Sequence, residues 1–233
     1  MTKVVFACKS NSCRSQMAEA WAKEWIRKRK ENLHSKLLSY DERNRENNLL
    51  QYEFNRENIE KSISALDNFV VVSIALDCAA VYEETVSYSD LFQIPAGFHK
   101  HHYKRKSIKE KAINAMAKDG IDISQSFPKA FQEVMPELEA NFPVEILSSS
   151  LSSLSRIGED EKDDVRPVDK LVVLCSCGDD MKKNLANQSK SVEEWNIDAP
   201  TAAAKSGEGD DAYHRVSLEI RDEVDNLMSR LVE

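Results

Sequence analysis

Three runs of apolar residues interrupt an otherwise polar chain. They cover residues 4–7, 69–76 and 170–174, and β-branched side chains are frequent among them. A short run that is apolar at nearly every position is typical of a strand buried on both faces of a sheet. The pattern therefore predicts an α/β protein with a parallel sheet.

Outside these runs, apolar positions repeat with the 3.6-residue period of helices. A first helix is predicted from Ser15, a second over 108–118 with Gly120 as its C-terminal cap, and a last one over 212–231. The side chains of the first helix that are expected to face the sheet are Met17, Ala20, Trp21 and Trp25. These helices would cover the apolar strands.

Two segments do not fit this arrangement of strands and helices. Residues 27–66 are rich in charged residues and Asn, with apolar residues at a loose helical spacing, which predicts a charged helical insertion. A solvated hairpin and a partner-docking arm both fit this segment, and runs of charge favour the hairpin. Residues 143–168 are Ser-rich and then acidic, which is typical of a flexible insertion. We expect a single α/β domain over 1–233 that contains both insertions.

Charge and cysteine content narrow the range of functions. The 233 residues include 32 Lys and Arg against 40 Asp and Glu, a net charge of -8 that argues against nucleic-acid binding. The five cysteines are an odd number, and the sequence has no signal peptide or apolar run of membrane length. We therefore expect a cytoplasmic protein with reduced thiols and no membrane partner.

The polar stretch between the first strand and the first helix, from Cys8 to Arg14, carries the candidate chemistry. Backbone N–H groups of such a loop converge on one point, the helix adds its positive end, and Arg14 supplies a two-pronged donor. This combination predicts a site for a tetrahedral oxyanion and favours a Cys8 thiolate that attacks it. The Ser15 hydroxyl would cap the helix or steady the thiolate. The residues predicted to surround the oxyanion are Lys9, Ser10, Asn11, Ser12, Cys13, Arg14 and Ser15.

The spacing of Cys8, five residues, Arg14 and Ser15 resembles the phosphate loop of the low-molecular-weight protein tyrosine phosphatase superfamily. Within that superfamily, the run Asn-Ser-Cys-Arg-Ser-Gln-Met-Ala-Glu is more similar to arsenate reductases than to phosphatases. The resemblance extends over residues 3–25, 107–126 and 169–231. It implies a four-stranded parallel sheet with helices on both faces, and it implies neither a metal nor a bound organic cofactor.

Two more cysteines follow the strand predicted at 170–174. Because the C-terminal edges of parallel strands face one crevice, Cys175 can lie near Cys8. The resemblance implies that Cys175 attacks the arsenic-bearing Cys8, which releases arsenite and leaves a disulfide. The pair Cys175 and Cys177, together with Lys9, resembles the glutathione- and glutaredoxin-coupled branch. Glutathione is therefore the expected reductant, with glutaredoxin or thioredoxin as the protein partner.

One position departs from the superfamily pattern. Its members carry an Asp-Pro pair whose Asp is the general acid, but here Ala199 precedes Pro200 and the carboxylate is one residue earlier, at Asp198. Asp198 is the candidate acid if the backbone shifts locally. Loss of a general acid would slow the reaction by about 10²- to 10⁴-fold, and a phosphate ester with a poor leaving group would suffer most.

These observations favour an arsenate reductase that takes arsenate or a phosphate-like oxyanion. A low-molecular-weight protein tyrosine phosphatase that uses Cys8 and Arg14, with Asp198 as its acid, is the nearest alternative. A catalytically weak module that binds an oxyanion or a partner is a further alternative, which Ala199 would suit. The His-rich run 99–106 predicts a basic loop rather than a metal site, because a metal site on a helix also needs a carboxylate or thiol nearby and this run contains neither.

Overall fold

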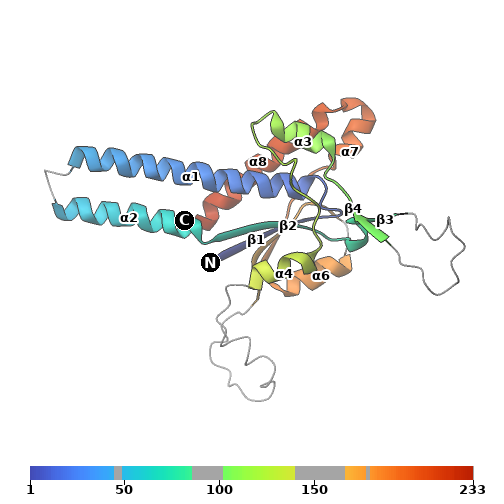
Figure 1. The fold of residues 1–233 in the computed structure, drawn as a ribbon, viewed down its shortest axis with the longest axis horizontal. Helices are drawn as coiled ribbons and strands as arrows, with labels where there is room; N and C mark the ends of the chain where they lie inside the picture. Colours follow the sequence, from blue (N-terminus) through green and yellow to red (C-terminus); the bar gives the residue numbers. More distant parts are fainter. Residues whose placement is uncertain (45–48, 86–101, 140–165, 177–178, 233) are drawn as a thin grey trace, which may run out of the picture.

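The computed structural model describes residues 1–44, 49–85, 102–139, 166–176 and 179–232. Its central sheet consists of four parallel strands in the order β2-β1-β5-β6 (Figure 1). The strands are β1 (Thr2–Cys8), β2 (Phe69–Ala75), β5 (Val168–Val173) and β6 (Ser189–Glu194). The predicted four-stranded parallel sheet is confirmed, and β1 lies in its middle.

Helices cover both faces of this sheet, also as predicted (Figure 1). Helices α1 (Arg14–Asn44), α3 (Glu110–Ala117) and α8 (Asp211–Val232) pack on one face, and α4 (Phe131–Glu139) and α6 (Asp179–Asn187) on the other. Side chains alternate along β1 because of the two-residue period of a strand. Val4, Phe6 and Cys8 therefore face α1 and α8, whereas Val5 and Ala7 face α4 and α6.

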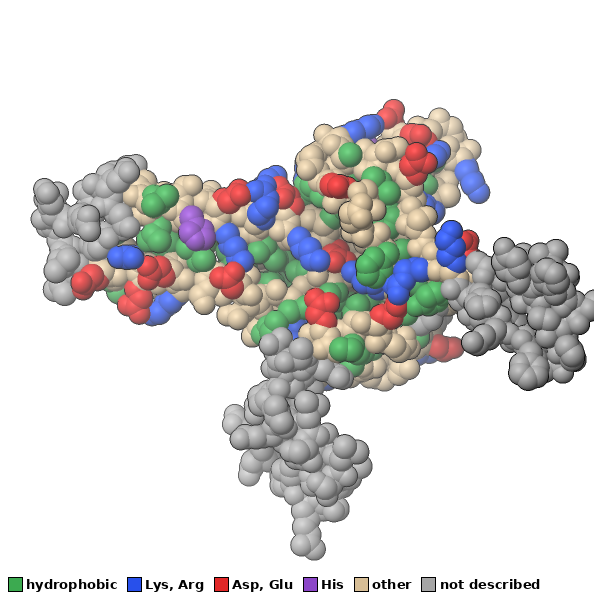
Figure 2. Space-filling model, in the orientation of Figure 1, with side chains coloured by type: hydrophobic (Ala, Val, Ile, Leu, Met, Phe, Trp, Pro, Cys, Tyr) green, Lys and Arg blue, Asp and Glu red, His purple; other side chains and the backbone are tan. Residues whose placement is uncertain are grey.

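Helices α1 and α2 (Leu49–Asp67) extend side by side beyond the sheet (Figure 1). The predicted helical content of 27–66 is thus present, but its boundary at residue 27 falls inside α1, which continues unbroken to Asn44. Leu33 and Leu66 are buried near the sheet, whereas Leu38 and Phe54 are 66% and 61% exposed farther out. On the face seen in Figure 2, charges of both signs and apolar side chains are interspersed over this pair.

Several shorter elements complete the described chain. A separate antiparallel pair, β3 (Tyr82–Thr85) and β4 (His102–Arg105), follows the 3-10 turn η1 (Cys78–Ala80). The loop predicted over 99–106 is therefore wrong for residues 102–105, which form β4, and 99–101 lie outside the described residues. The flexible insertion predicted over 143–168 also lies mostly outside them, and its last residue, Val168, begins β5. Helix α7 (Pro200–Ala203) and the π-helical turn η3 (Ala204–Glu208) lead into α8.

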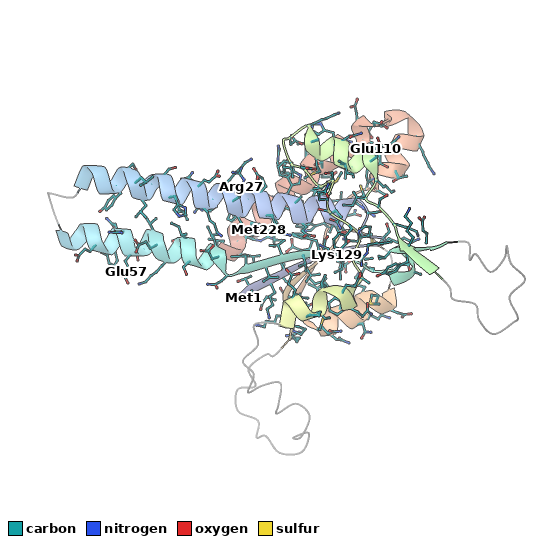
Figure 3. The ribbon with its side chains drawn as sticks, in the orientation of Figure 1. Met1, Arg27, Glu57, Glu110, Lys129 and Met228 are labelled. Atoms are coloured by element: carbon teal, nitrogen blue, oxygen red, sulfur yellow. The ribbon has the colours of Figure 1, made fainter. Side chains whose placement is uncertain are left out.

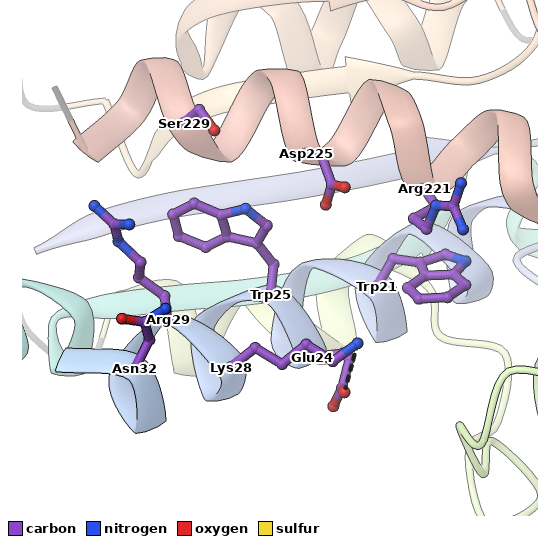
Figure 4. Close-up of a pocket in the computed structure, with 9 residues that line it drawn as sticks. All are labelled: Trp21, Glu24, Trp25, Lys28, Arg29, Asn32, Arg221, Asp225 and Ser229. Carbon is purple, nitrogen blue, oxygen red and sulfur yellow. Dashed lines mark ion pairs between the residues drawn. The ribbon is translucent and has the colours of Figure 1, made fainter. Parts of the chain in front are cut away.

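A groove of about 330 Å³ separates the exposed sides of α1 and α8 (Figure 4). Trp21 and Trp25 form its α1 side, and the Arg221 guanidinium lies 5.9 Å from the centre of the Trp21 ring. Burial raises the pKa of Asp225 on its α8 side, and the charge of Asp222 adds to this rise. No helix within the described ranges has the length and hydropathy needed to cross a membrane.

Candidate active site

The polar loop after β1 is held from outside by its carbonyl oxygens. The backbone N–H groups of Leu76, Asp77 and Lys109 donate to the carbonyls of Cys8, Lys9 and Ser12, at 2.8, 2.9 and 3.0 Å. By contrast, the backbone N–H groups of residues 9–15 have no acceptor anywhere in the described part of the chain. Unpaired N–H groups at the start of a helix form a ready site for an anion. Each of the seven residues predicted to bind the oxyanion, 9–15, thus has a backbone N–H that no described group of the protein accepts from.

A chain of hydrogen bonds leads from the Cys8 thiol into the protein. Asn11 Oδ1 accepts from the backbone N–H of Lys129 at 2.7 Å and from Gln16 Nε2 at 2.8 Å. Since a backbone N–H can only donate, this fixes the orientation of the Asn11 amide. Asn11 Nδ2 then donates to Ser15 Oγ at 2.8 Å, and Ser15 Oγ lies 2.9 Å from Cys8 Sγ. Either the Ser15 hydroxyl or the Cys8 thiol can be the donor in this last bond, so the chain ends on the sulfur predicted to be the nucleophile.

The two cysteines of the loop differ in their surroundings. Both are buried free thiols. Burial raises the pKa of Cys13 to about 12, the negative charge of Cys8 adds to this rise, and the charges of Lys109 and Arg14 oppose it. Cys13 is therefore a neutral thiol near pH 7 and a poor nucleophile. The hydrogen-bonded sulfur in this loop is that of Cys8, the residue predicted to be the nucleophile.

Arg14 connects the loop to the segment that carries the candidate acid. Its Nη1 donates to the carbonyl oxygen of Ile197 at 2.7 Å. Ile197 and Pro200 are buried, and Asp198 between them is exposed. Glu208 raises the pKa of Arg215, and the charges of Glu219 and Asp198 contribute smaller increases. Its role as an acid stays a prediction.

Cys175 lies at the same edge of the sheet as Cys8. Ala7 pairs with Val173 in register, and the N–H of Leu174 donates to the Ala7 carbonyl at 2.8 Å. Cys8 and Cys175 therefore both follow this last paired position on adjacent strands. Cys175 is half-buried and disulfide-bonded, whereas Cys8 is free. Cys177 lies outside the described residues.

A buried ionic cluster supports the loop from behind. The Glu19 carboxylate accepts from Lys129 Nζ at 2.8 Å, Lys23 Nζ at 2.5 Å and Ser73 Oγ at 2.5 Å. Burial by itself raises the pKa of Glu19, but the two ammonium groups outweigh it and hold the pKa below its ordinary value. Lys129, labelled near the centre of Figure 3, thus contacts Asn11 through its backbone and Glu19 through its side chain.

Sequence analysis did not identify this cluster. Gln16 and Glu19 lie in the stretch that resembles the superfamily, so their positions offered a signal. Lys129 and Ser73 lie far along the chain and have no local pattern that would single them out. Within the described ranges, no group of three His, Cys, Asp or Glu side chains is placed to hold a metal ion.

A comparison with known protein families matches the part of the chain that contains the polar loop after β1. A family model described as low molecular weight phosphotyrosine protein phosphatase matches residues 3–46, which include nearly all of β1, the loop and the whole of α1. No curated protein matches the chain.

Solved structures with related folds include three kinds of enzyme. An arsenate reductase in the phosphate binding state is 18% identical, with 99% of this chain and 98% of that chain covered and a TM-score of 0.48. A YwlE arginine phosphatase from Geobacillus stearothermophilus is 12% identical, with 99% and 93% covered and a TM-score of 0.46. A low molecular weight protein tyrosine phosphatase from T. tengcongensis is 14% identical, with 99% of each chain covered and a TM-score of 0.44.

Similarity at this level assigns no activity to the present chain. The firmer evidence is the family-model match together with the sheet order and the loop geometry. The resemblance predicted over residues 3–25 is thus confirmed, and the family match extends beyond it to residue 46; residues 3–46 are a stretch that this chain shares with the low-molecular-weight phosphotyrosine protein phosphatase family.

Proposed function

We propose that this protein is an arsenate reductase in which Cys8 is the nucleophile. The observation that carries the proposal is the adjacency of β1 and β5, because it brings Cys8 and Cys175 to one edge of the sheet. The free N–H groups of residues 9–15 and the Arg14 guanidinium would hold arsenate there. The hydrogen bond between Ser15 and Cys8 supports Cys8 as the nucleophile, because a Cys8 thiolate would accept it from the hydroxyl.

The proposed reaction transfers two electrons from two thiols to arsenic. The Cys8 thiolate attacks arsenic, and an arsenate oxygen leaves as water once it is protonated. The Cys175 thiolate then attacks the sulfur of Cys8. A disulfide forms, the sulfur–arsenic bond breaks, and its electron pair stays on arsenic, which leaves as arsenite. Cys175 is disulfide-bonded in the structure, so that disulfide has to be reduced before this step.

A second exchange would regenerate Cys8. The Cys177 thiolate attacks Cys175, which frees the Cys8 thiolate and leaves a disulfide between Cys175 and Cys177. Two glutathione thiols, directly or through glutaredoxin, reduce this disulfide and are themselves oxidised. The scheme places the protein in a reducing compartment such as the cytoplasm, and it uses no bound cofactor.

The test is arsenate-dependent NADPH consumption in a system with glutathione, glutathione reductase and glutaredoxin. We expect Cys8→Ser and Cys175→Ser each to lower the rate at least about 100-fold, because each removes a sulfur that forms a bond. Ser176→Ala, beside Cys175 and exposed, is the matched control and should keep the rate. Equal rates for wild type and Cys175→Ser would contradict the relay.

A tyrosine phosphatase is the second candidate, because Arg14 ties the segment that carries Asp198 to the loop. In that case an aryl phosphate would be hydrolysed with Cys8 as the nucleophile, and Cys175→Ser would leave the rate unchanged. Asp198→Asn would lower this rate by about 10²- to 10⁴-fold. Binding of phosphate without turnover of either substrate would instead indicate a catalytically weak module, the remaining alternative.

A further inference from the structure

Lys109 stands beside the oxyanion loop, and no carboxylate among the described residues neutralises it. It precedes α3, and its backbone N–H donates to the carbonyl of Ser12, within the loop. Its ammonium donates to Thr201 Oγ1 at 2.6 Å, and Thr201 Oγ1 in turn lies 3.0 Å from the Tyr213 hydroxyl. A hydroxyl fixes the position of the ammonium but does not neutralise its charge.

Two lysines of the following helix and its end differ in this respect. Lys111 and Lys118 form ion pairs with Asp210 and Asp211. Lys109 forms no ion pair with any carboxylate in the described part of the chain. In a protein of net charge -8 the overall field repels anions, so a cation beside the loop that no described carboxylate neutralises is a local source of attraction.

The charge of Lys109 also acts inside the loop. Burial raises the pKa of Cys13, the charge of Cys8 adds to this rise, and of the two cations that oppose it Lys109 has the larger effect and Arg14 the smaller. The bond from the Lys109 N–H to the Ser12 carbonyl also polarises the peptide that presents the Cys13 N–H. Both effects favour negative charge in the loop.

We propose that Lys109 is a second cationic determinant of the oxyanion site, and that with Arg14 it selects doubly charged tetrahedral anions over singly charged ones. This inference rests on the oxyanion site of the proposed function, and it holds for either reaction. The physical basis is Coulomb's law, since the interaction energy doubles when the charge of the ligand doubles. Lys109 acts from the rim of the loop, where its side chain is exposed.

The test compares the binding of sulfate, a dianion, with that of methyl sulfate, a monoanion with the same head group, by calorimetry on the full chain. We expect Lys109→Met to weaken methyl sulfate binding about 3-fold and sulfate binding about 10-fold at low salt. Doubling the charge of the ligand doubles the interaction energy that is lost, and this squares the factor by which the affinity falls. Both losses should shrink at an ionic strength of about 0.5 M, where exposed charges are screened. Lys109→Arg should restore the preference.

Lys111→Met is the matched control, because it removes a charge from the same region that Asp210 already neutralises. It should leave both affinities within about 2-fold of wild type. Equal losses for the two anions in Lys109→Met, or no loss, would overturn the role of Lys109 while leaving the oxyanion site intact. Failure of the wild type to bind sulfate or arsenate would overturn the site itself and the inference with it.

Discussion

The backbone of Asn11 and the amide of its side chain together determine how the Cys8 thiol is presented. Asn11 adopts a φ of 49°, in the left-handed region that Asn tolerates better than most residues. Its amide is buried and spans from Lys129 to Ser15. A single residue therefore shapes the turn of the loop and directs the hydroxyl that contacts Cys8.

At this scale we expect Ser15→Ala to slow the reaction of Cys8 with iodoacetamide by about 3- to 10-fold near pH 6, because a hydrogen bond to the thiolate is lost. Mass spectrometry of the Cys8 peptide measures the rate. Ser10→Ala is the control, since the Ser10 hydroxyl bonds to Ser12 instead. Unchanged alkylation in Ser15→Ala would show that the hydroxyl does not stabilise the thiolate.

Among the elements, the α1/α2 pair is anchored at one end and solvated at the other. Leu66, at the end of α2, is 1% exposed and Lys30 pairs with Asp67 beside it. Farther from the sheet, surface ion pairs such as Lys61 with Glu57 predominate, and these contribute little stability. The pair is therefore stabilised mainly where it meets the sheet.

Two substitutions on α2 test whether the end near the sheet contributes more stability than the outer end. We expect Leu66→Ala to lower the free energy of unfolding by about 3 kcal/mol, because it leaves a cavity under the helix. Phe54→Ala should lower it by less than about 0.5 kcal/mol, because the ring is already largely exposed. Urea denaturation measures both. A loss for Phe54→Ala as large as that for Leu66→Ala would mean that a partner covers the outer end.

For the molecule as a whole, the Glu19 cluster joins parts of the chain that are remote in sequence. Glu19 lies on α1, Ser73 on β2 and Lys129 just before α4, which packs on the opposite face of the sheet. The segment at Lys129 also continues the sheet edge, because the N–H of Ala75 donates to the Lys129 carbonyl at 2.8 Å. The cluster thus couples the fold of the whole domain to the loop.

We expect Glu19→Ala to lower the free energy of unfolding by about 3 to 5 kcal/mol at pH 7, since Lys129 would stay largely buried without its partner. Lys23→Ala is the control. Its ammonium is mostly exposed, so the loss should be below about 1 kcal/mol. Urea denaturation measures both, and similar losses for the two variants would contradict a buried ion pair.

The contribution of the Glu19–Lys129 ion pair to the stability of the fold depends on pH. The folded-state pKa of Glu19 lies below its ordinary value of 4.5. The ionised carboxylate therefore contributes its full stabilisation above pH 4.5, and this stabilisation is lost as pH falls through the folded-state pKa. The difference in stability between wild type and Glu19→Gln should therefore shrink from about pH 6 to about pH 3. A difference that grows on acidification would reverse the sign of the assigned shift.

Much of the sheet could be predicted because its central strands are apolar on both faces. Strand β6 was missed, since Lys190 and Glu193 belong to a half-exposed edge strand whose composition resembles a loop. Strand β4 was missed for a similar reason, because its basic residues pair with β3 outside the core. The pattern of apolar residues identifies a strand only where its side chains are buried. These two strands expose many side chains and are held mainly by backbone hydrogen bonds, so the pattern did not reveal them.

By itself, the sequence determined the chemistry of the loop, because Cys8, Arg14 and Ser15 lie within one turn between a strand and a helix and need no distant partner to be brought together. Only the tertiary structure decided what surrounds them. Lys109, Lys129 and the Ile197 carbonyl reach the loop from remote segments. The physical reason is that a buried polar group requires a partner, but which residue supplies it depends on the packing of the whole chain.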